Sequence, residues 1–191
     1  STSATVTGGT LVGLIGTDGA NVTLAQTGLF ASANAANGVS VAVTASISGA
    51  ASGNYILVQP NPVTANITPK ELTVTGTVVS NKVYDRTTAA TVTAGTLDGV
   101  ISADNGNIVL TRAGTFVTSG VGTAITIVMN NTITGTAAAN YTLTQPTGVT
   151  ANITTKALTI TAGNVSSVYG SATSLGTSSF TQSGLISGDT I

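Results

Sequence analysis

Residues 63–68 read Val-Thr-Ala-Asn-Ile-Thr, and residues 149–154 read Val-Thr-Ala-Asn-Ile-Thr again. Sliding the chain by this offset of about 86 residues aligns it with itself without a gap. About 31 of the 71 positions from Ala4 to Val74 are identical to their counterparts, far more than chance would give. A fixed period of this length indicates tandem copies of one small structural repeat.

The offset divides the chain into three copies. Copy one (residues 1–69) lacks the beginning of the repeat, copy two (residues 70–155) is complete, and copy three (residues 156–191) contains only the first part. The pattern Gly, aliphatic, Ile, two variable residues, Asp occurs once in each copy, at residues 13–18, 99–104 and 184–189. Because Ser1 corresponds to about Thr87, copy one has no counterpart of the strand expected at residues 72–78.

Alternation of apolar and polar residues predicts β-strands throughout. Residues 39–43 and 125–129 each place aliphatic side chains at every second position, which puts them on one face of a strand. Gly and Asn clusters separate such runs, and we count about seven short strands in copy two. The predicted fold class is all-β, with tandem small antiparallel β-sandwich (Ig-like) repeats. A β-grasp-like repeat is the alternative, and it would require one helix that the sequence does not indicate.

The differences between copies separate the core from the surface. Val39, Val41 and Val43 became Ile125, Ile127 and Met129, and such conservative changes are typical of a packed interior. Positions that changed in character are expected to face outward, namely Val12 to Asp98, Gln26 to Arg112 and Glu71 to Ala157. The predicted core of copy two consists of Leu72, Val92, Phe116, Ile125, Ile127, Tyr141, Leu143 and Ile153.

Composition excludes several classes of protein. Charged residues make up 6% of the chain, against about 25% in ordinary soluble proteins, and the net charge is -1. No basic patch is present, so no nucleic-acid partner is expected. Polar residues interrupt each apolar run well before the roughly 20 residues of a spanning helix, which favours a protein that is not transmembrane. Residues 1–9 do not read as a signal peptide, so a secretion signal would lie outside this sequence.

The residues needed for most catalytic chemistry are missing. The chain has no His and no Cys, which excludes His-based acid–base pairs and thiol nucleophiles. Asp18, Asp104 and Asp189 recur at one position per copy beside Gly or Asn, a pattern typical of Asx turns. A Ca²⁺ site at Asp104, Asn105 and Asn107 is the alternative, since Ca²⁺ prefers oxygen ligands. We predict no catalytic, cofactor-binding or metal-binding residues, and no enzyme activity.

Other recurring polar residues also favour structural roles. Tyr55 and Tyr141 each follow an Asn and are expected to be buried tyrosines whose hydroxyls tie a corner, with sugar binding as the alternative. Lys70 and Lys156 stand at the junctions between copies, and we interpret them as linker charges rather than as partners in Lys–Asn isopeptide crosslinks. The Asn-x-Thr/Ser sequons follow from composition. They lie at Asn21, Asn66, Asn130, Asn140, Asn152 and Asn164.

The octapeptide Lys-Val-Tyr-Asp-Arg-Thr-Thr-Ala at residues 82–89 resembles the signature of the YDG-type repeat, with Arg86 where that family usually has Gly. If the position requires a positive φ, Arg is strained there. The rest of the repeat pattern is matched by Gly95-Thr96-Leu97, Gly114, Phe116, Asn140-Tyr141-Thr142-Leu143 and Gln145-Pro146. Copy one matches the part of the repeat that it contains. Copy three more closely resembles the MBG type, through Val168-Tyr169-Gly170, Ser179-Phe180, Ser183-Gly184-Leu185 and Gly188-Asp189.

This resemblance implies a function, because such repeats occur in large secreted bacterial adhesins of the filamentous-haemagglutinin kind. It implies a secreted, extracellular chain at the bacterial cell surface, acting as a stalk or spacer that projects a binding region. Its partners would be neighbouring repeats of the same chain. The alternatives are a subunit of a self-assembling filament or surface layer, built by strand addition between copies of the chain, and direct binding of surface or matrix polysaccharide. In a stalk, flanking sequence would complete the partial copies. In a filament, copy three of one chain would complete copy one of the next.

Overall fold

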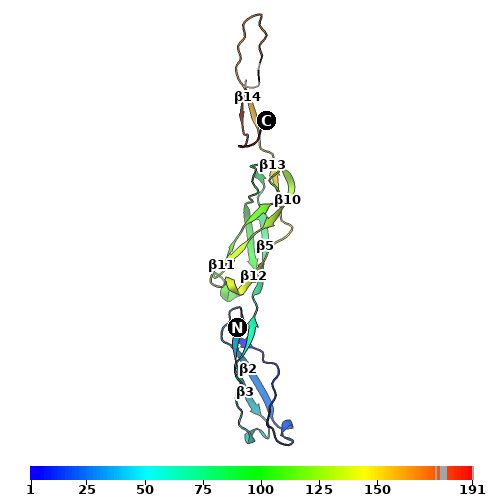
Figure 1. Ribbon diagram of the computed structural model, residues 1–191, viewed down its shortest axis with the longest axis vertical. Helices are drawn as coiled ribbons and strands as arrows, with labels where there is room; N and C mark the ends of the chain where they lie inside the picture. Colours follow the sequence, from blue (N-terminus) through cyan, green and yellow to red (C-terminus); the bar gives the residue numbers. More distant parts are fainter. Residues whose placement is uncertain (175, 177–179, 191) are drawn as a thin grey trace. The chain divides into compact units, whose positions relative to one another are not determined.

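The chain folds into β-strands joined by loops, as a computed structural model of residues 1–174, 176 and 180–190 shows (Figure 1). Within these residues there is no α-helix, and none of their helices is long and apolar enough to cross a membrane. The 3-10 helices are η1 (Asp18–Ala20), η2 (Ser52–Asn54), η3 (Ser102–Asp104) and η4 (Ala138–Asn140). The all-β prediction is confirmed, and the helix that a β-grasp repeat needs is absent from the described residues. Ser179, part of the MBG-like pattern, lies outside them.

Two compact units divide the chain. The first contains residues Ser1–Glu71 and Gly135–Thr142, and the second contains Leu72–Thr134 and Leu143–Ile191. A short part of copy two, around η4, therefore belongs to the first unit, so the units do not coincide with the sequence copies.

The first unit is built on a four-stranded antiparallel sheet. Its strands are β1 (Ser3–Ala4), β2 (Thr23–Phe30), β3 (Ala36–Ser48) and β4 (Val63–Ile67), in that order across the sheet. The alternation predicted for residues 39–43 is present, since Val41 is 3% exposed and its neighbours Ser40 and Ala42 are both exposed. Gln26, expected on the outer surface, is half-buried because its place in the alternation of β2 is an inward one.

The second unit contains most of copy two and the whole of copy three. Its strands, of which β5 and β12 each have their first two residues in the first unit, are β5 (Lys70–Val79), β6 (Lys82–Val83), β7 (Val92–Asp98), β8 (Val109–Thr111), β9 (Gly114–Phe116), β10 (Gly122–Met129), β11 (Thr132–Thr134), β12 (Tyr141–Thr144), β13 (Thr150–Thr154), β14 (Thr159–Ala162) and β15 (Phe180–Ser183). They pair in the orders β6-β13-β10-β9, β12-β5-β7, β11-β8 and β14-β15. Residues 70–155 thus form more strands than the seven expected, because several are only two or three residues long. One pairing, β6 with β13, is parallel rather than antiparallel.

The main hydrophobic core lies between strands of two of these sheets. Phe116, Ile127, Met129, Ala151 and Ile153 form the buried cluster on β9, β10 and β13. Val79 of β5 and Val92 of β7 pack against it. Of the predicted core, Leu72, Phe116, Ile127, Tyr141 and Ile153 are buried, and Val92, Ile125 and Leu143 are half-buried.

A β-bulge recurs at the same position of both copies. The register shifts between Ala36 and Val39 in β3, and between Gly122 and Ile125 in β10. The bulged residue is Gly38 (φ +65°) in copy one and Ala124 (φ +49°) in copy two. Both lie in the left-handed region that L side chains disfavour, so the second copy keeps the bulge without the glycine.

Candidate functional site

A cluster of charged and polar side chains lies in a turn formed by residues 82–87. Lys82 Nζ lies 2.7 Å from Asp85 Oδ1, 2.6 Å from the Thr87 carbonyl oxygen and 2.9 Å from Thr87 Oγ1. The backbone N–H of Thr87 donates to Asp85 Oδ1 at 2.9 Å, which is an Asx turn. The parallel pairing of β6 with β13 fixes the start of this turn, because Lys82 lies opposite Ile153.

The hydrogen bonds of the turn stabilise the charged form of Asp85. The hydrogen bond from Lys82, followed by those from the N–H and hydroxyl of Thr87, lowers the pKa of Asp85 to about 2. The Lys82 ammonium also lies 5.4 Å from the centre of the Phe116 ring, within the range of a cation–π contact. Lys82 and Asp85 therefore form an ion pair. The turn therefore acts as a structural clamp on the start of copy two.

Arg86, inside this turn, has a left-handed backbone with φ +65°. The position therefore requires the positive φ for which glycine is best suited, and an L side chain there costs about 1–2 kcal/mol. Its guanidinium Nη1 donates to the carbonyl oxygen of Ser187 at 3.0 Å and lies 3.4 Å from Asp189 Oδ1. The strained residue thus joins the signature turn of copy two to the last described segment of copy three.

The Asp of the recurring Gly-aliphatic-Ile-x-x-Asp pattern closes a backbone turn in all three copies. The N–H of Asp18, Asp104 and Asp189 donates to the carbonyl oxygen of the Ile three residues earlier, at 3.2, 2.8 and 2.9 Å. The prediction of a turn is confirmed, but the predicted type is wrong for Asp18 and Asp189, because their carboxylates contact other side chains instead of nearby N–H groups. Asp189 faces Arg86, and Asp18 Oδ2 accepts a hydrogen bond from the Tyr55 hydroxyl at 2.8 Å.

The Tyr55 hydroxyl ties a corner as predicted, but the Tyr55 side chain is half-buried rather than buried, whereas Tyr141 is buried as predicted. The Tyr55 hydroxyl accepts a hydrogen bond from the N–H of Ile15 at 3.0 Å and donates to Asp18. Both polar functions of the hydroxyl are therefore used inside the protein, which favours a structural role over a sugar contact.

Two further hydrogen-bond clamps occur in both copies, and sequence reasoning missed their role. The side-chain amide of Gln59 bonds both the N–H and the carbonyl of Ala45, each at 2.9 Å. In copy two, Gln145 bonds the N–H and carbonyl of Asn131 at 3.0 and 2.8 Å. The side-chain amide thereby makes the two backbone hydrogen bonds that a neighbouring strand would otherwise make to that residue. The available signal was the identity of Gln59 and Gln145 between the copies.

The second clamp holds the recurring bulge. Asn66 Oδ1 accepts the N–H of Gly38 at 2.8 Å, and Asn152 Oδ1 accepts the N–H of Ala124 at the same distance. Both asparagines belong to sequons, and both lie in the repeated Val-Thr-Ala-Asn-Ile-Thr sequence. Their identity between the copies therefore has a structural reason, because each supplies the acceptor for an N–H group that the bulge removes from the ladder.

Comparison with known families identifies part of the chain. The family model of the YDG domain matches residues 68–148. The matched YDG domain contains the charged turn, the Gln145 clamp and the bulge at Ala124, while the Asn152 acceptor follows it. No curated protein and no solved structure matches the chain.

The Ca²⁺ alternative gains no support from the geometry of the YDG domain. Asp104 ends η3, and the N–H groups of Asn105 and Asn107 donate to the carbonyl oxygens of Ser102 and Asp104. Across the residues that the structure describes, no three His, Cys, Asp or Glu side chains gather as metal ligands would.

Of the junction lysines, Lys70 is exposed at the start of β5, and Lys156 borders a hollow of about 250 Å³ beside Tyr84, Leu158 and Asp189.

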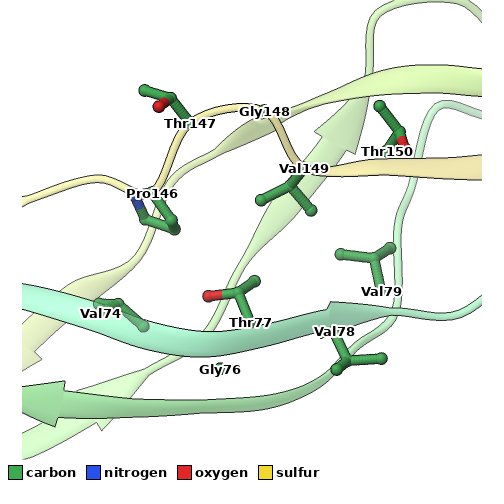
Figure 2. A pocket seen from close by; sticks show the side chains of 10 residues that line it. All are labelled: Val74, Gly76, Thr77, Val78, Val79, Pro146, Thr147, Gly148, Val149 and Thr150. Carbon is green, nitrogen blue, oxygen red and sulfur yellow. The ribbon is translucent and has the colours of Figure 1, made fainter.

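A larger hollow of about 450 Å³ lies between β5 and residues 146–150, at the end of the YDG domain (Figure 2). Figure 2 shows Thr77 and Val79 on the side of β5 that faces Val149, with Val78 on the opposite side. Thr77 Oγ1 is buried and has no hydrogen-bond partner in the protein. The lining consists of Val, Thr, Pro and Gly residues without a charged or catalytic group, so the hollow offers no acid–base chemistry.

Proposed function

We propose that the chain is a stalk or spacer segment of an extracellular bacterial adhesin. In this proposal copies one and two are Ig-like β-sandwich repeats of the YDG type, and copy three is the first part of an MBG-type repeat. The chain is secreted and lies at the bacterial cell surface, where it projects a binding region of the adhesin away from the cell. It catalyses no reaction.

One observation carries this proposal. The polar side chains that are identical in copies one and two, such as Gln59 and Gln145, are engaged with the chain's own backbone at matching positions. Duplication therefore preserved the groups that hold the fold. A repeated binding site would instead show recurring charged groups directed into a hollow, and the lining of the hollow beside β5 contains no charged residue.

Contacts within each compact unit also link residues of adjacent copies, as a spacer requires. In the first unit, Asn140 of copy two accepts the N–H of Ala35 at 2.8 Å and donates to Asn34 Oδ1 at 3.3 Å. In the second unit, Arg86 of copy two contacts Ser187 and Asp189 of copy three. Repeats stabilised by their own cores and by such nearest-neighbour contacts behave as a linear array.

Single-molecule extension tests the mechanical role. The chain is tethered by its two ends and stretched, and we expect a discrete unfolding step for each compact unit, followed by recovery on relaxation. Complete extension of the 86-residue period corresponds to roughly 280–310 Å at 3.3–3.6 Å per residue. Smooth extension without steps would contradict a load-bearing spacer.

Antibody labelling tests the location. An antibody against the chain should label intact cells of the source bacterium, and protease added outside the cells should remove the label. Labelling only after permeabilisation would contradict the surface location, whatever the mechanical experiment shows.

A further inference from the structure

The segment that enters copy two and the segment that leaves it meet directly in the pair of β6 with β13. Lys82 lies opposite Ile153 and Val83 lies opposite Thr154, and the two strands are parallel. The strand before them, β5, pairs with β7 and β12 instead of with β13. Among the described strands of copy two, the β6–β13 pair is therefore the direct connection between the start and the end of the repeat.

Further hydrogen bonds lengthen this contact beyond the two residues of β6. Asn81 Oδ1 accepts the N–H of Asn152 at 2.7 Å, before the paired residues. The N–H of Tyr84 donates to the carbonyl oxygen of Thr154 at 2.9 Å, after them. Thr154 Oγ1 also donates to the carbonyl oxygen of Lys82 at 3.3 Å. The contact therefore extends over residues 81–84 on one side and residues 152–154 on the other.

Both strands of the pair are anchored to the rest of the YDG domain. The Lys82 ammonium bonds Asp85 and Thr87 and lies 5.4 Å from the centre of the Phe116 ring, which is buried in the main core. Ile153, opposite Lys82, is 1% exposed and belongs to the same core. Drawing β6 out of the pair therefore breaks the charged turn, and drawing β13 out exposes Ile153 to water.

The parallel direction of the pair decides how tension acts on it. Because the two strands run the same way, the chain enters β6 at one end of the pair and leaves β13 at the opposite end. Tension along the chain therefore slides the strands past each other and loads their hydrogen bonds together. In an antiparallel hairpin the chain enters and leaves at the same end, so tension breaks the bonds one after another.

We propose that the contact between residues 81–84 and residues 152–154 is a mechanical clamp that sets the force at which copy two unfolds under tension. The octapeptide at residues 82–89 then has a mechanical role, because its charged turn anchors β6 in the clamp. The use of this resistance rests on the spacer role proposed above, whereas the resistance itself is a property of the fold. Forced unfolding is governed by the unfolding rate, so the clamp acts on the barrier to unfolding more than on the equilibrium stability.

The direction of pulling tests the mechanical clamp in single-molecule extension. The chain has no cysteine, so the double variant Val83→Cys/Thr154→Cys provides two defined attachment points, and both side chains are exposed. Pulling this chain by its ends slides β6 along β13, whereas pulling through the two introduced cysteines separates opposite residues. Because the bonds share the load only when the strands slide, the unfolding force should be about two- to threefold higher when the ends are pulled.

The oxidised form of the same variant identifies the unfolding step of copy two. A disulfide between positions 83 and 154 closes a loop of 154 − 83 = 71 residues, which can no longer be extended. The step of copy two should therefore shorten by roughly 230–260 Å at 3.3–3.6 Å per residue, and a reducing agent should restore it.

A pair of single variants separates mechanical resistance from equilibrium stability. Lys82→Met keeps the aliphatic stem and removes the bonds to Asp85 and Thr87, so it should lower the unfolding force towards the value measured through the two cysteines. Gln145→Leu is the matched control, because the bonds of Gln145 to Asn131 lie outside the clamp. It should lower the stability in urea and leave the unfolding force of copy two unchanged.

Two results would overturn the proposal. They are equal unfolding forces in the two pulling directions, and a larger loss of force for Gln145→Leu than for Lys82→Met. If either were accompanied by discrete unfolding steps, the spacer role would stand without this clamp. Antibody labelling that requires permeabilisation would contradict the spacer role and leave the clamp unaffected, so the two proposals can fail separately.

Discussion

Exchanging glycine and alanine at the recurring bulge should change the stability of the two copies in opposite directions. Gly38 and Ala124 hold the same bulge, both with positive φ, and both N–H groups donate to an Asn side chain at 2.8 Å. Ala124→Gly should stabilise copy two, and Gly38→Ala should destabilise copy one. The hydrogen bond and the register are the same in both, so the backbone conformation is the main variable.

The expected magnitude follows from two opposing effects. An alanine in the left-handed region costs about 1–2 kcal/mol, while a glycine loses about 0.5–1 kcal/mol more conformational entropy on folding. The difference leaves about 0.5–1 kcal/mol in favour of glycine at both positions. A Cβ added at Gly38 would have no heavy atom within 4 Å, so Gly38→Ala introduces no clash that would enlarge the effect.

Urea unfolding followed by tyrosine fluorescence and circular dichroism measures these changes. We expect a higher midpoint for Ala124→Gly and a lower one for Gly38→Ala, with the denaturant slope unchanged. Ala89→Gly is the matched control, because Ala89 is exposed, lies in an extended bridge to Thr115 and has no positive φ. It should destabilise the protein. If Ala124→Gly destabilises as much as this control does, the strain argument is refuted.

Four other predictions concern the core, the clamps and the absence of metal. Ile127→Ala should cost about 2–5 kcal/mol in urea unfolding, since Ile127 is 4% exposed in the main core; a loss below about 0.5 kcal/mol would mean that its inward placement is wrong. Gln145→Leu should cost about 1–3 kcal/mol in the same assay because it leaves the backbone of Asn131 without partners. The pKa of Asp85 in the folded protein is lowered to about 2, so the stabilisation of the fold by the ionised carboxylate is present above about pH 4 and is lost as the pH falls through 2. In urea unfolding from pH 7 to pH 2, the free energy of unfolding should therefore fall less steeply for Asp85→Asn than for the unaltered chain. Calorimetry with and without EDTA should give the same melting temperature, and a fall of more than a few degrees would support the Ca²⁺ alternative.

The sequence predicts which residues are buried better than it predicts which strands pair. Period-two alternation fixes the face of each strand, so Ile127 and Ile153 were predicted to be buried, and they are. Alternation carries no information about the neighbouring strand or its direction. The parallel pairing of Lys82–Val83 with β13 and the bulge at Ala124 therefore had no signal in the sequence of copy two alone.

The candidate site shows the same limit for polar residues. The recurrence of Asp18, Asp104 and Asp189 predicted a turn, and each copy has one. The partner of each carboxylate depends on residues distant in the sequence, Tyr55 for Asp18 and Arg86 for Asp189. Such contacts depend on the tertiary arrangement, which local sequence patterns do not specify.

The differences between copies one and two show which constraints on this fold would cost more free energy of unfolding if they were lost. The clamp residues Gln145 and Asn152 are identical to their counterparts, and losing either would leave backbone groups without partners at about 1–3 kcal/mol. The bulged residue changed from Gly38 to Ala124 although the left-handed backbone was kept, at a net cost of about 0.5–1 kcal/mol. A repeat can tolerate the smaller cost when the clamp still holds the bulge. The same reasoning applies to Arg86, where a left-handed backbone persists without glycine in a turn already held by Lys82 and Asp85, and where the larger side chain adds a contact to copy three.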